Sequence, residues 1–549
     1  MIVLRDWITP HLNFIPYLDK PPFLYWLTAV CYQLLGVSGF SARLVTALAA
    51  IAGVGVTYGI GRDLWGRNAG LASGLILATT LGYFIFSRTV LTDMLFSVLL
   101  AMALWAMGRG LLAESPRRGT MLCGYAAMAL AVLTKGLIGL VFPVLTVGAF
   151  LLLTRDWRLF SRLDLGRGGA LFLAIAAPWH IMAGLKHPDF FWLYFADEHF
   201  LRFTAQRPLA DYSPMSLHAF LIMVIIWTLP WSVFLPVALW HYWPSAKAMS
   251  REERGFLFIV LWAASVIGFF ALTPSRLEYY SMPAFPALAL LVGRLWEGEI
   301  YSHAMRESAR GLWLSCFLLL SIPVGLLPIP WFLEHLENGS TYTTLLGALD
   351  VQAREIQAGI LYNAKVYSVP SIHELLPILQ WATLTLLMGT GVATFAWLRR
   401  RKALTFGCLV ATMLPILALV QSGIIMFEPH RSGVQLAEVI QREIRLGDQL
   451  IVEGPFEIFA SVTFYTGQRA RVLHGLFGDL KFASRYPEAR GMFLEEEEFQ
   501  RLWQGSGRVF LLSDSPNRLG KLQALGSEPV LLGRSGKNWL FSNRARSAE

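Results

Sequence analysis

The sequence contains little charge and little cysteine. Of its 549 residues, 55% are hydrophobic and only 15% are charged. Soluble domains carry about a quarter charged residues, so a water-soluble globule is excluded. The four cysteines stand in apolar surroundings and form no CxxC pair, which argues against a disulfide framework or a cysteine-based metal site. These cysteines are Cys31, Cys123, Cys316 and Cys408.

A concentrated block of positive charge is also missing. The net charge is +9, but the basic residues lie between apolar runs and do not form one basic segment. Nucleic-acid-binding proteins gather such residues on one face or helix. A nucleic-acid partner is therefore not expected, and the charge is more typical of membrane topology.

Long apolar runs make up most of the chain. A helix needs about 20 apolar residues to cross a hydrocarbon core of about 30 Å. The sequence predicts a polytopic α-helical membrane protein, with one shorter apolar piece, 21–37, lying at the membrane surface. The twelve predicted spans lie near residues 40–60, 69–87, 90–113, 119–134, 136–154, 168–185, 216–240, 255–273, 280–296, 311–332, 376–397 and 404–421.

Lysine and arginine divide unequally between alternate loops. The loops that follow the odd-numbered predicted spans hold seventeen basic residues, and the other loops between spans hold eight, although two of these are much longer. Because cytoplasmic loops are enriched in Lys and Arg, the first set is predicted to be cytoplasmic. Residues 1–39, the loops at 186–215 and 333–375, and everything after about 422 are then expected to face the opposite, external side of the membrane.

The composition becomes charged and mixed from Phe427 onward. Runs such as DQLIVEG and GRVFLLS are typical of strands, and EEEEFQRLW is typical of a helix. A segment of this length suffices for a small α/β domain. The predicted organisation is an external loop with an interfacial helix at 1–39, a transmembrane bundle at 40–421 and a soluble α/β domain at 422–549.

A first polar cluster lies in the external segment YLDKPP. Tyr17, Asp19 and Lys20 precede two prolines, which stiffen the backbone. A rigid loop with a lysine and a tyrosine suits an anionic lipid headgroup. The alternative is an interfacial anchor, because Lys, Tyr and Trp favour that depth in any case.

A second cluster is expected around the external turns SRTVLTDM and LTKG. Asp93 begins a predicted helix, where a carboxylate either complements the helix dipole or orients a reacting group. Arg88 belongs to the same turn. Lys135 belongs to the other turn, where it either extends to the membrane surface or binds an anion.

The segment FADEHFLRF contains acidic, basic and imidazole side chains. Glu198 and Arg202 have the i, i+4 spacing of an ion pair on a helix surface. His199 and Asp19 are a candidate pair of ligands for a divalent metal. Both interpretations stay open at this point.

The segment TPSRLEYYS crowds a short external loop before a predicted span. Arg276 offers a planar donor fork that suits phosphate, and an Arg276–Glu278 ion pair is the alternative. Tyr279 and Tyr280 follow directly. Together, these clusters predict an outward-facing pocket with basic groups for phosphate and aromatic groups for lipid or sugar. Charges at the bilayer midplane and paired broken helices, the marks of a coupled transporter, are not evident in the sequence.

The order of motifs resembles a known family. DWITPHLN, YLDKPPFLYW, the pair Thr92 and Asp93, LTKG, APWH, EHFLRF and SRLEYYSMPAFPALALL resemble the C-type glycosyltransferase superfamily, which includes the protein O-mannosyltransferases. The chain is most similar to the bacterial aminoarabinose transferases, which modify lipid A with 4-amino-4-deoxy-L-arabinose. The resemblance implies a C-type bundle, an undecaprenyl-phosphate-linked sugar as donor, lipid A or a related envelope acceptor, and a site at the periplasmic face of the inner membrane.

The resemblance also implies roles for residues of this sequence. Lys20 and Arg202 would hold the lipid phosphate, Arg276 would be a third cation, and Asp93 would be a catalytic acidic residue. The tyrosines that would line the donor pocket are Tyr17 and Tyr280, and the other pocket candidates are Arg88, Lys135, Glu198, Glu278 and Tyr279.

The sequence departs from the family pattern at its start. A second catalytic acidic residue of the family lies in an acidic-Arg-Tyr motif shortly before the equivalent of DWITPH, just after a first span. That motif is absent from the printed sequence, and we expect it, together with the first span, upstream of Met1. Asp19 stands where relatives often have Glu, and SRLEYY stands where aminoarabinose transferases tend to have Lys-Leu-Pro-Tyr, which leaves the sugar open.

Two alternative functions remain open at the level of sequence. The same enzyme class could act on protein, O-antigen or another glycan, and a flippase of lipid-linked sugars would share a lipid-phosphate pocket. The residues demand no cofactor, and a divalent metal is left open. The expected partners are the lipid-linked donor, the envelope acceptor and membrane lipids.

Overall fold

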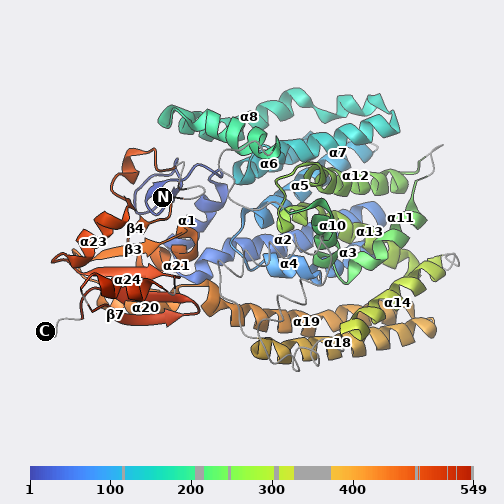
Figure 1. Ribbon diagram of the computed structural model, residues 1–549. Coiled ribbons are helices and arrows are strands. Elements are labelled where there is room, and N and C mark those ends of the chain that lie inside the picture. Colours follow the sequence, from blue (N-terminus) through green and yellow to red (C-terminus); the bar gives the residue numbers. More distant parts are fainter. Residues whose placement is uncertain are drawn as a thin grey trace.

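The structure is a computed structural model (Figure 1). It describes residues 1–549 except 114–117, 205–214, 245–248, 302–307, 327–371, 477–479, 481–482, 516, 527 and 546–549. Most of the predicted loop at 333–375 lies outside the described residues. The chain forms a helical bundle followed by a small domain built on a β-sheet, which packs at one end of the bundle beside the N-terminus (Figure 1).

The bundle is built from α-helices joined by short turns. Those of its first half are α1 (Phe23–Leu35), α2 (Gly39–Trp65), α3 (Arg67–Ala78), α4 (Leu81–Phe86), α5 (Thr92–Leu112), α6 (Arg118–Lys135), α7 (Ile138–Thr154) and α8 (Leu165–Lys186). Those of its second half are α9 (Arg202–Thr204), α10 (Leu217–Trp227), α11 (Leu235–Tyr242), α12 (Arg251–Leu272), α13 (Phe285–Tyr301), α14 (Ser308–Leu326), α18 (Ile372–Leu398) and α19 (Lys402–Arg431).

Within the described part of the bundle, tighter or wider helical turns interrupt the α-helices at four places. The segment η2 (Trp192–Leu201) is a π-helix, a form that is rare and frequently found at functional sites. The other three, η1 (Trp157–Leu163), η3 (Trp231–Phe234) and η4 (Glu278–Ala284), are 3-10 helices.

Six of the described helices are long and apolar enough to cross a membrane, and the count rises to seven if one bent pair forms a single span. These six are α2, α5, α8, α12, α18 and α19. The multi-span membrane architecture predicted from the sequence is therefore confirmed. The other predicted spans correspond to shorter or interrupted helices, and α1 has only 13 residues, as suits the predicted interfacial piece.

Two of the predicted spans are broken in the structure. The run 69–87 forms α3 and α4 with a break at Thr79 and Thr80, and the run 216–240 forms α10 and α11, which are bent by 99°. Proline at 230 lacks the backbone N–H that would continue α10. The indole of Trp231 donates a hydrogen bond to Thr79 Oγ1 (3.0 Å), so the two breaks lie side by side. Hydropathy alone predicts the runs but not these breaks.

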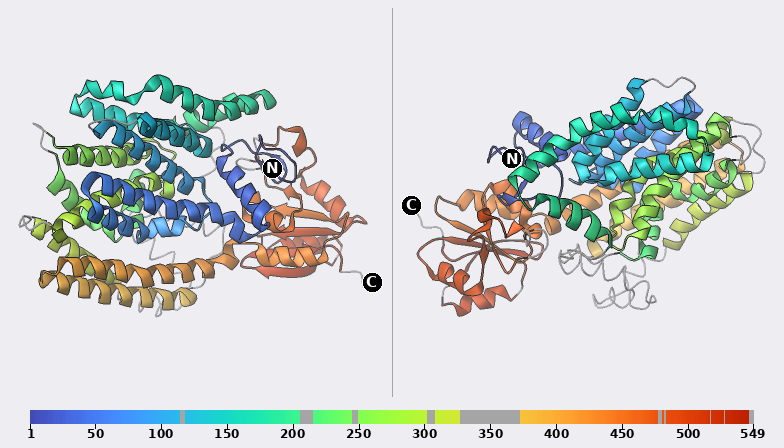
Figure 2. Two further views of the ribbon diagram at one scale, coloured as in Figure 1. Left: turned by 180° about the vertical axis from the view of Figure 1, so that it is seen from behind. Right: turned by 90° about the horizontal axis from the view of Figure 1, so that it is seen from above.

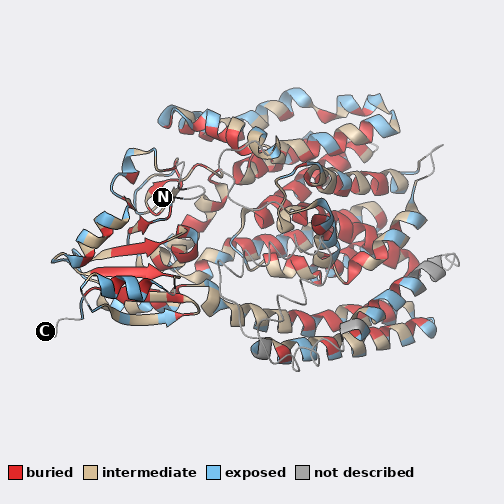
Figure 3. Ribbon diagram, viewed as in Figure 1, coloured by how far each residue is buried: buried red, intermediate tan, exposed pale blue. Residues whose placement is uncertain are grey.

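The interior of the bundle is filled by aromatic and small residues. Figure 3 shows buried residues concentrated where the helices face one another, with exposed residues along the outer sides of α8 and α18. Trp262 and Trp296 are among the largest fully buried side chains. The α2 and α3 backbones approach closely, because a Cβ on Gly61 would lie 2.9 Å from the Cα of Gly70. Small residues of this kind drive helix packing in membranes.

The C-terminal region forms an α/β domain, as the sequence predicts. Its strands are β3 (Gln449–Glu453), β4 (Ala470–Leu473), β5 (Phe493–Leu494), β6 (Val509–Ser513), β7 (Val530–Ser535) and β8 (Asn538–Ser542). They pair in the order β5-β4-β3-β6-β8-β7, with β5, β4, β3 and β6 parallel and the β8 and β7 hairpin antiparallel. The helices that accompany the sheet among the described residues are α20 (Val434–Glu443), α21 (Phe456–Thr466), α23 (Glu496–Gln504) and α24 (Arg518–Ala524).

Helices cover both faces of this sheet. Alternate residues of β3 point to opposite faces, as the period of a strand requires. Val452 packs with α20 and α21, whereas Ile451 packs with α23 and α24. The two hydrophobic layers explain why these strands consist of nearly continuous apolar residues.

The N-terminal segment is packed between the bundle and this domain (Figure 2). It forms a two-stranded ribbon of β1 (His11–Leu12) and β2 (Ile15–Pro16). Ile15 is fully buried within the hydrophobic core of the C-terminal domain. The Asn13 side chain donates to the Ala470 carbonyl (2.8 Å) and accepts from the Ala470 N–H (3.0 Å) at the start of β4. The segment that leads to Tyr17, Asp19 and Lys20 is therefore fixed from both sides.

Candidate active site

The first half of the site is the loop between β2 and α1. Lys20 Nζ donates to Asp19 Oδ2 (2.6 Å), and the Tyr17 hydroxyl donates to the same carboxylate oxygen (3.1 Å). Pro21 and Pro22 follow immediately and lead into α1, with Pro22 as the residue before its first turn. Their fixed φ angles restrict the backbone next to the lysine. The three polar residues predicted as a cluster thus contact one another.

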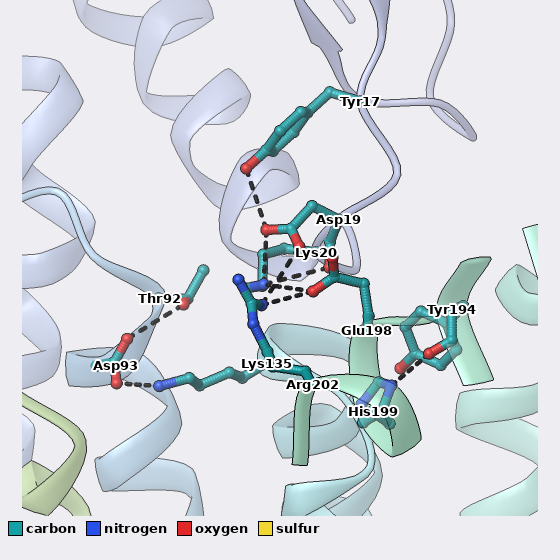
Figure 4. Close-up of polar contacts among 10 residues, drawn as sticks. All are labelled: Tyr17, Asp19, Lys20, Thr92, Asp93, Lys135, Tyr194, Glu198, His199 and Arg202. Carbon is teal, nitrogen blue, oxygen red and sulfur yellow. Dashed lines mark hydrogen bonds and ion pairs between the residues drawn. The ribbon is translucent and has the colours of Figure 1, made fainter. Parts of the chain in front are cut away.

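The π-helix η2 supplies the second half of the site. Arg202 NH1 donates to Glu198 Oε2 (2.5 Å) and lies 3.7 Å from Asp19 Oδ1. Lys20 Nζ lies 3.8 Å from the same Glu198 oxygen. Figure 4 shows the four side chains converging from the loop, from η2 and from the start of α9. The predicted Glu198–Arg202 pair is present, but it is part of a partly buried four-residue cluster and not an isolated ion pair on a helix surface.

The two carboxyl groups of this cluster have opposite pKa shifts. Burial, and next the negative charge of Asp19, hold the pKa of Glu198 well above its usual range. Burial alone would raise the pKa of Asp19, but Lys20, a hydrogen bond from Glu198 and the charge of Arg202 hold it well below that range. Glu198 is thus the protonated partner and Asp19 the ionised one. With Lys20 and Arg202 charged, the cluster carries one net positive charge.

A second ion pair joins α5 to α6. Lys135, the last residue of α6, donates to Asp93 Oδ1 in the first turn of α5. Both side chains are buried, with exposures of 8% and 3%. The sequence identified these two residues in separate turns, and the structure brings them together. Removing one partner of such a pair costs about 3–5 kcal/mol, since an uncompensated charge stays buried.

Aromatic rings surround the Lys135 ammonium. Its nitrogen lies 4.9 Å from the centroid of the Tyr280 ring and 5.7 Å from that of Tyr279. Phe96 supplies a third ring at 5.8 Å. Burial raises the pKa of Tyr280, while the positive charges of Arg202 and Lys20 act in the opposite direction. The aromatic residues predicted for the pocket, Tyr279 and Tyr280, therefore lie beside its charged residues.

His199 supports the site and is not placed as a metal ligand. Its Nδ1 bonds to the Tyr194 carbonyl, and its Nε2 accepts from the Leu137 N–H (2.9 Å). Both ring nitrogens are therefore occupied. Burial lowers the pKa of His199 to about 4, so the ring is neutral at physiological pH. The imidazole fixes the turn between α6 and α7, directly after Lys135.

The metal interpretation finds no support in the geometry. Within the described ranges, no group of three or more His, Cys, Asp or Glu side chains is placed to hold a metal ion. The predicted pair of Asp19 and His199 is divided between two separate networks, one ionic and one made of backbone hydrogen bonds. All four cysteines are free thiols.

Two predicted arginines have other partners. Arg276 donates from Nε, NH1 and NH2 to the carbonyls of Thr273 (2.8 Å), Met215 (3.2 Å) and Ala271 (3.3 Å). Its guanidinium braces the connections around α12, and no ion pair to Glu278 is formed among the described contacts. Arg88 donates to Gln421 Oε1 (2.6 Å) on α19 and stacks on the Phe84 ring. Neither joins the cluster around Lys20 and Arg202.

The sequence did not single out every residue that builds the site. Phe96 lies on the buried side of α5, within an apolar run. In such a run the sequence does not distinguish a phenylalanine of the site from one that only packs in the core. Tyr194 contributes its backbone carbonyl, for which a sequence carries no signal. Gly136, at φ +111°, allows the backbone of the turn to approach the His199 ring closely. A Cβ at this position would lie 2.5 Å from His199 Nε2. A glycine directly after Lys135 in LTKG was the available signal.

Comparisons with known proteins identify relatives of this arrangement. A family model described as dolichyl-phosphate-mannose-protein mannosyltransferase matches residues 19–182, which contain Asp19, Lys20, Asp93 and Lys135. An undecaprenyl phosphate-alpha-4-amino-4-deoxy-L-arabinose arabinosyl transferase of Aeromonas hydrophila is 30% identical over 343 residues, which are 59% of this chain and 59% of that protein. The chain thus spans well under two thirds of the length of this relative.

Longer matches exist as well. A second arabinosyl transferase of the same description, from Pseudomonas fluorescens, is 25% identical over 523 residues, or 92% of this chain and 84% of that protein. The crystal structure of ArnT from Cupriavidus metallidurans bound to undecaprenyl phosphate superposes with a TM-score of 0.79 at 25% identity. That superposition covers 99% of this chain and 92% of the other, so the similarity includes both the bundle and the C-terminal domain.

Proposed function

We propose that this chain is an aminoarabinose-transferase-like member of the C-type, polyprenyl-phosphate-dependent glycosyltransferases and that it transfers 4-amino-4-deoxy-L-arabinose from undecaprenyl phosphate to lipid A. The ArnT structure that superposes on 99% of this chain holds undecaprenyl phosphate. The curated relatives carry the arabinosyl transferase description. The fold, the lipid-phosphate donor and the sugar thus have separate support.

The observation that carries the proposal is the cationic cluster of Lys20 and Arg202. Lys20 and Arg202 approach Asp19 and Glu198 from different elements. The cluster of these four residues carries one net positive charge, which matches a single phosphate group. Charge-assisted hydrogen bonds from Lys and Arg are the strong contacts for phosphate oxygens. Arg276, whose donors are bonded to backbone carbonyls, has no place in this binding step.

The reaction proposed is a displacement at the anomeric carbon of the sugar. The bond between that carbon and the phosphate oxygen of the donor breaks, and an oxygen of a lipid A phosphate forms the new bond. Undecaprenyl phosphate leaves with the electron pair. Lys20 and Arg202 offset the negative charge that develops on the leaving group, which is the main contribution expected of positioned cations.

Asp93 is proposed to orient the sugar or the acceptor. Its salt bridge to Lys135 fixes the carboxylate at the start of α5. No general base is needed when the attacking group is an anionic phosphate, because no proton has to be removed from it. The residues described provide no metal site, and no step depends on one.

The site is proposed to face the periplasm, with the C-terminal domain on the same side. The excess of basic residues in the alternate loops, such as Arg399–Lys402 and Arg155–Arg167, supports this orientation. Asp93 lies at the start of α5 and Arg109 lies in its last turn, so the site is at the end of the bundle away from these loops. Single cysteines introduced at Ser432 and at Arg400 test this orientation, because labelling of whole cells measures which of the two positions is accessible from outside. Labelling at Arg400 alone contradicts the proposed orientation.

The test of the function is a transfer assay with purified protein. Undecaprenyl-phosphate aminoarabinose and lipid A are mixed with the protein in detergent, and mass spectrometry measures lipid A with one added sugar. A flippase gives no covalent product, so the absence of any product with a folded protein contradicts the enzyme class. Because the matching family model is named for protein mannosyltransferases, peptide acceptors form a second arm. Transfer to peptide but not to lipid A overturns the acceptor and retains the class.

A further inference from the structure

The π-helix η2 has the reverse of the polarity that is found in a helix at a water-exposed surface. Its two carboxylates, on Asp197 and Glu198, are buried, with exposures of 2% and 6%. A helix in contact with water carries its apolar residues inward and its charged residues outward. The outer face of η2 is therefore expected to contact hydrocarbon. The exposed residues between positions 191 and 201 are all aromatic: Phe191, Trp192, Phe195 and Phe200.

The wide turn of the π-helix produces this division into two faces. Phe191, Phe195 and Phe200 are separated by four and by five positions, which matches one side of a helix whose hydrogen bonds join residues five positions apart. Their exposures are 48%, 40% and 65%. Glu198 and Arg202 lie on the other side, facing the loop between β2 and α1 (Figure 4). One face thus belongs to the cation cluster, and the opposite face is an aromatic stripe made of the three phenylalanines.

The aromatic stripe continues the outer side of α8. This helix is one of those long and apolar enough to span a membrane, and most of its apolar stretch is not covered by other helices. Ile181 and Leu185, near its C-terminal end, are exposed. Phe191 packs directly on this end, because a Cβ on Gly184 would lie 2.2 Å from the Phe191 ring. The hydrocarbon that covers α8 therefore extends to the stripe.

The other end of η2 is attached to α12, a second helix that is long and apolar enough to span a membrane. The Phe203 ring, just after η2, lies 4.9 Å from the Phe269 ring of α12. The Thr273 hydroxyl, next to the last residue of α12, donates to the Phe203 carbonyl (3.0 Å). The helices α8 and α12 both end here, at Lys186 and Leu272. The π-helix therefore lies between the ends of two candidate spans, at the membrane boundary on the side of the candidate active site.

We propose that η2 is an interfacial anchor, whose aromatic stripe inserts among the acyl chains of the leaflet on the side of the candidate active site. A helix held in this way lies in the plane of the interface, with its apolar face below the level of the headgroups. Its other face then holds Glu198 and Arg202 at the level of the lipid phosphates. This position suits a donor whose phosphate belongs to a membrane lipid. That consequence rests on the proposed function, whereas the insertion itself does not.

Spin labels measure the insertion directly. Phe195→Cys and Phe200→Cys are labelled with a nitroxide in a chain whose native cysteines are replaced by alanine, and the protein is reconstituted in phospholipid nanodiscs. Power saturation compares the contact of each label with oxygen, which concentrates in hydrocarbon, and with a water-soluble nickel chelate. Both labels are expected to behave like a label at Leu173→Cys, on the exposed side of α8, and unlike a label at Leu446→Cys, an exposed position of the C-terminal domain.

Two outcomes of this measurement overturn the proposal. Labels at Phe195 and Phe200 that contact the nickel chelate as the Leu446 label does show that the stripe lies in water. Labels that contact neither reagent show that a second copy of the chain or another protein covers it. Hydroxyl-radical footprinting of the unmodified protein in the same nanodiscs needs no substitution, and the stripe should stay unoxidised. Oxidation of Phe195 or Phe200 contradicts the insertion.

A transfer assay in nanodiscs tests the consequence for the donor. The double variant of Phe195→Ser and Phe200→Ser weakens the anchor and is expected to raise the KM for the undecaprenyl-phosphate donor about tenfold, with kcat unchanged. A short donor with two isoprene units reaches the site from water, so its KM should not change. Leu173→Ser, which removes an exposed leucine from α8, is the matched control and should leave both KM values unchanged.

The two donors separate anchoring from damage to the site. An equal rise in KM for both donors shows that the double variant disturbs the cation cluster itself, and it overturns the anchoring role. Absence of transfer with every donor and with the unmodified protein contradicts the proposed function, and the spin labels then decide the insertion without it.

Discussion

At the scale of single residues, the site depends on which charges are compensated. Lys20 and Arg202 share Asp19 and Glu198, whereas Lys135 has Asp93. Charged side chains are expensive to bury and mark functional positions in membrane proteins. The first three predictions follow from this division.

Loss of either shared cation should reduce transfer strongly. Lys20→Met and Arg202→Met remove charge from the position proposed for the leaving phosphate, and a decrease in kcat of about 10²–10³ is expected for each. Transfer to lipid A in detergent measures it. Lys186→Met is the control, because Lys186 bonds to Asp6 outside the cluster. Full activity of the Lys20 and Arg202 variants contradicts the assignment of the site.

The protonation of Glu198 should shape the pH dependence of transfer. Because its pKa is raised, Glu198 is neutral at lower pH, and it ionises as the pH rises through that value. The new negative charge then opposes the donor phosphate, so activity should fall on the alkaline side. Glu198→Gln keeps the group neutral and should lose this decline while it retains activity at neutral pH. The same alkaline limb in both proteins argues against this role.

Variants of the Asp93–Lys135 pair should separate the effect of these residues on stability from their effect on activity. Lys135→Met leaves Asp93 buried without its partner and should lower the free energy of unfolding by about 3–5 kcal/mol. The double variant with Asp93→Asn removes both charges and should recover most of that stability. It should not recover transfer, because the carboxylate is gone. Thermal unfolding and the transfer assay, applied to the same samples, separate the two effects.

At the scale of elements, the turn between α6 and α7 positions the Lys135 side chain of the site. The turn after α6 holds Lys135, and His199 of η2 binds this turn through the Leu137 N–H. Gly136 permits that approach, with φ at +111° and no side chain. The π-helix and the α6–α7 turn therefore form one unit, although they lie about 60 residues apart in sequence.

Gly136→Ala should disrupt this unit. The added Cβ meets His199 Nε2 at 2.5 Å and requires a backbone conformation that alanine rarely adopts, at a cost on the order of 1–3 kcal/mol. Transfer should fall together with the melting temperature. Gly148→Ala in α7 is the matched control, since a Cβ there has open space around it and alanine favours a helix. A neutral Gly136→Ala variant shows that the turn is not needed in this form.

At the scale of the whole molecule, the C-terminal domain holds the loop that carries Lys20. Asn13 pairs with the start of β4 through two hydrogen bonds, and Ile15 enters the core of that domain. On the other side, the Trp179 indole of α8 donates to the Ile8 carbonyl (2.8 Å). These contacts hold the N-terminal loop between the C-terminal domain and α8.

Asn13→Gly tests the contact between the N-terminal loop and the C-terminal domain. Asn13 has a φ of +50°, which glycine adopts without strain, so the change removes the two hydrogen bonds and leaves the backbone free to keep its shape. We expect a loss of about 1–3 kcal/mol, because the Ala470 N–H and C=O stay buried. Faster amide exchange at Ala470, together with a higher KM for the lipid donor, is the expected outcome. Unchanged exchange at Ala470 shows that the contact contributes nothing.

The sequence alone determined the multi-span architecture and which segments carry the charged residues of the candidate site. Apolar runs predicted a multi-span membrane protein, and the composition after Phe427 predicted the α/β domain. The segments with Lys20, Asp93 and Arg202 were recognisable because several polar side chains cluster in each of them. Only the tertiary structure decided which charges meet. It paired Asp93 with Lys135, drew Glu198 into the cluster of Asp19 and Lys20, and directed Arg276 to backbone carbonyls. Periodicity and hydropathy are local properties, whereas each of these contacts joins segments that folding brings together from distant parts of the chain.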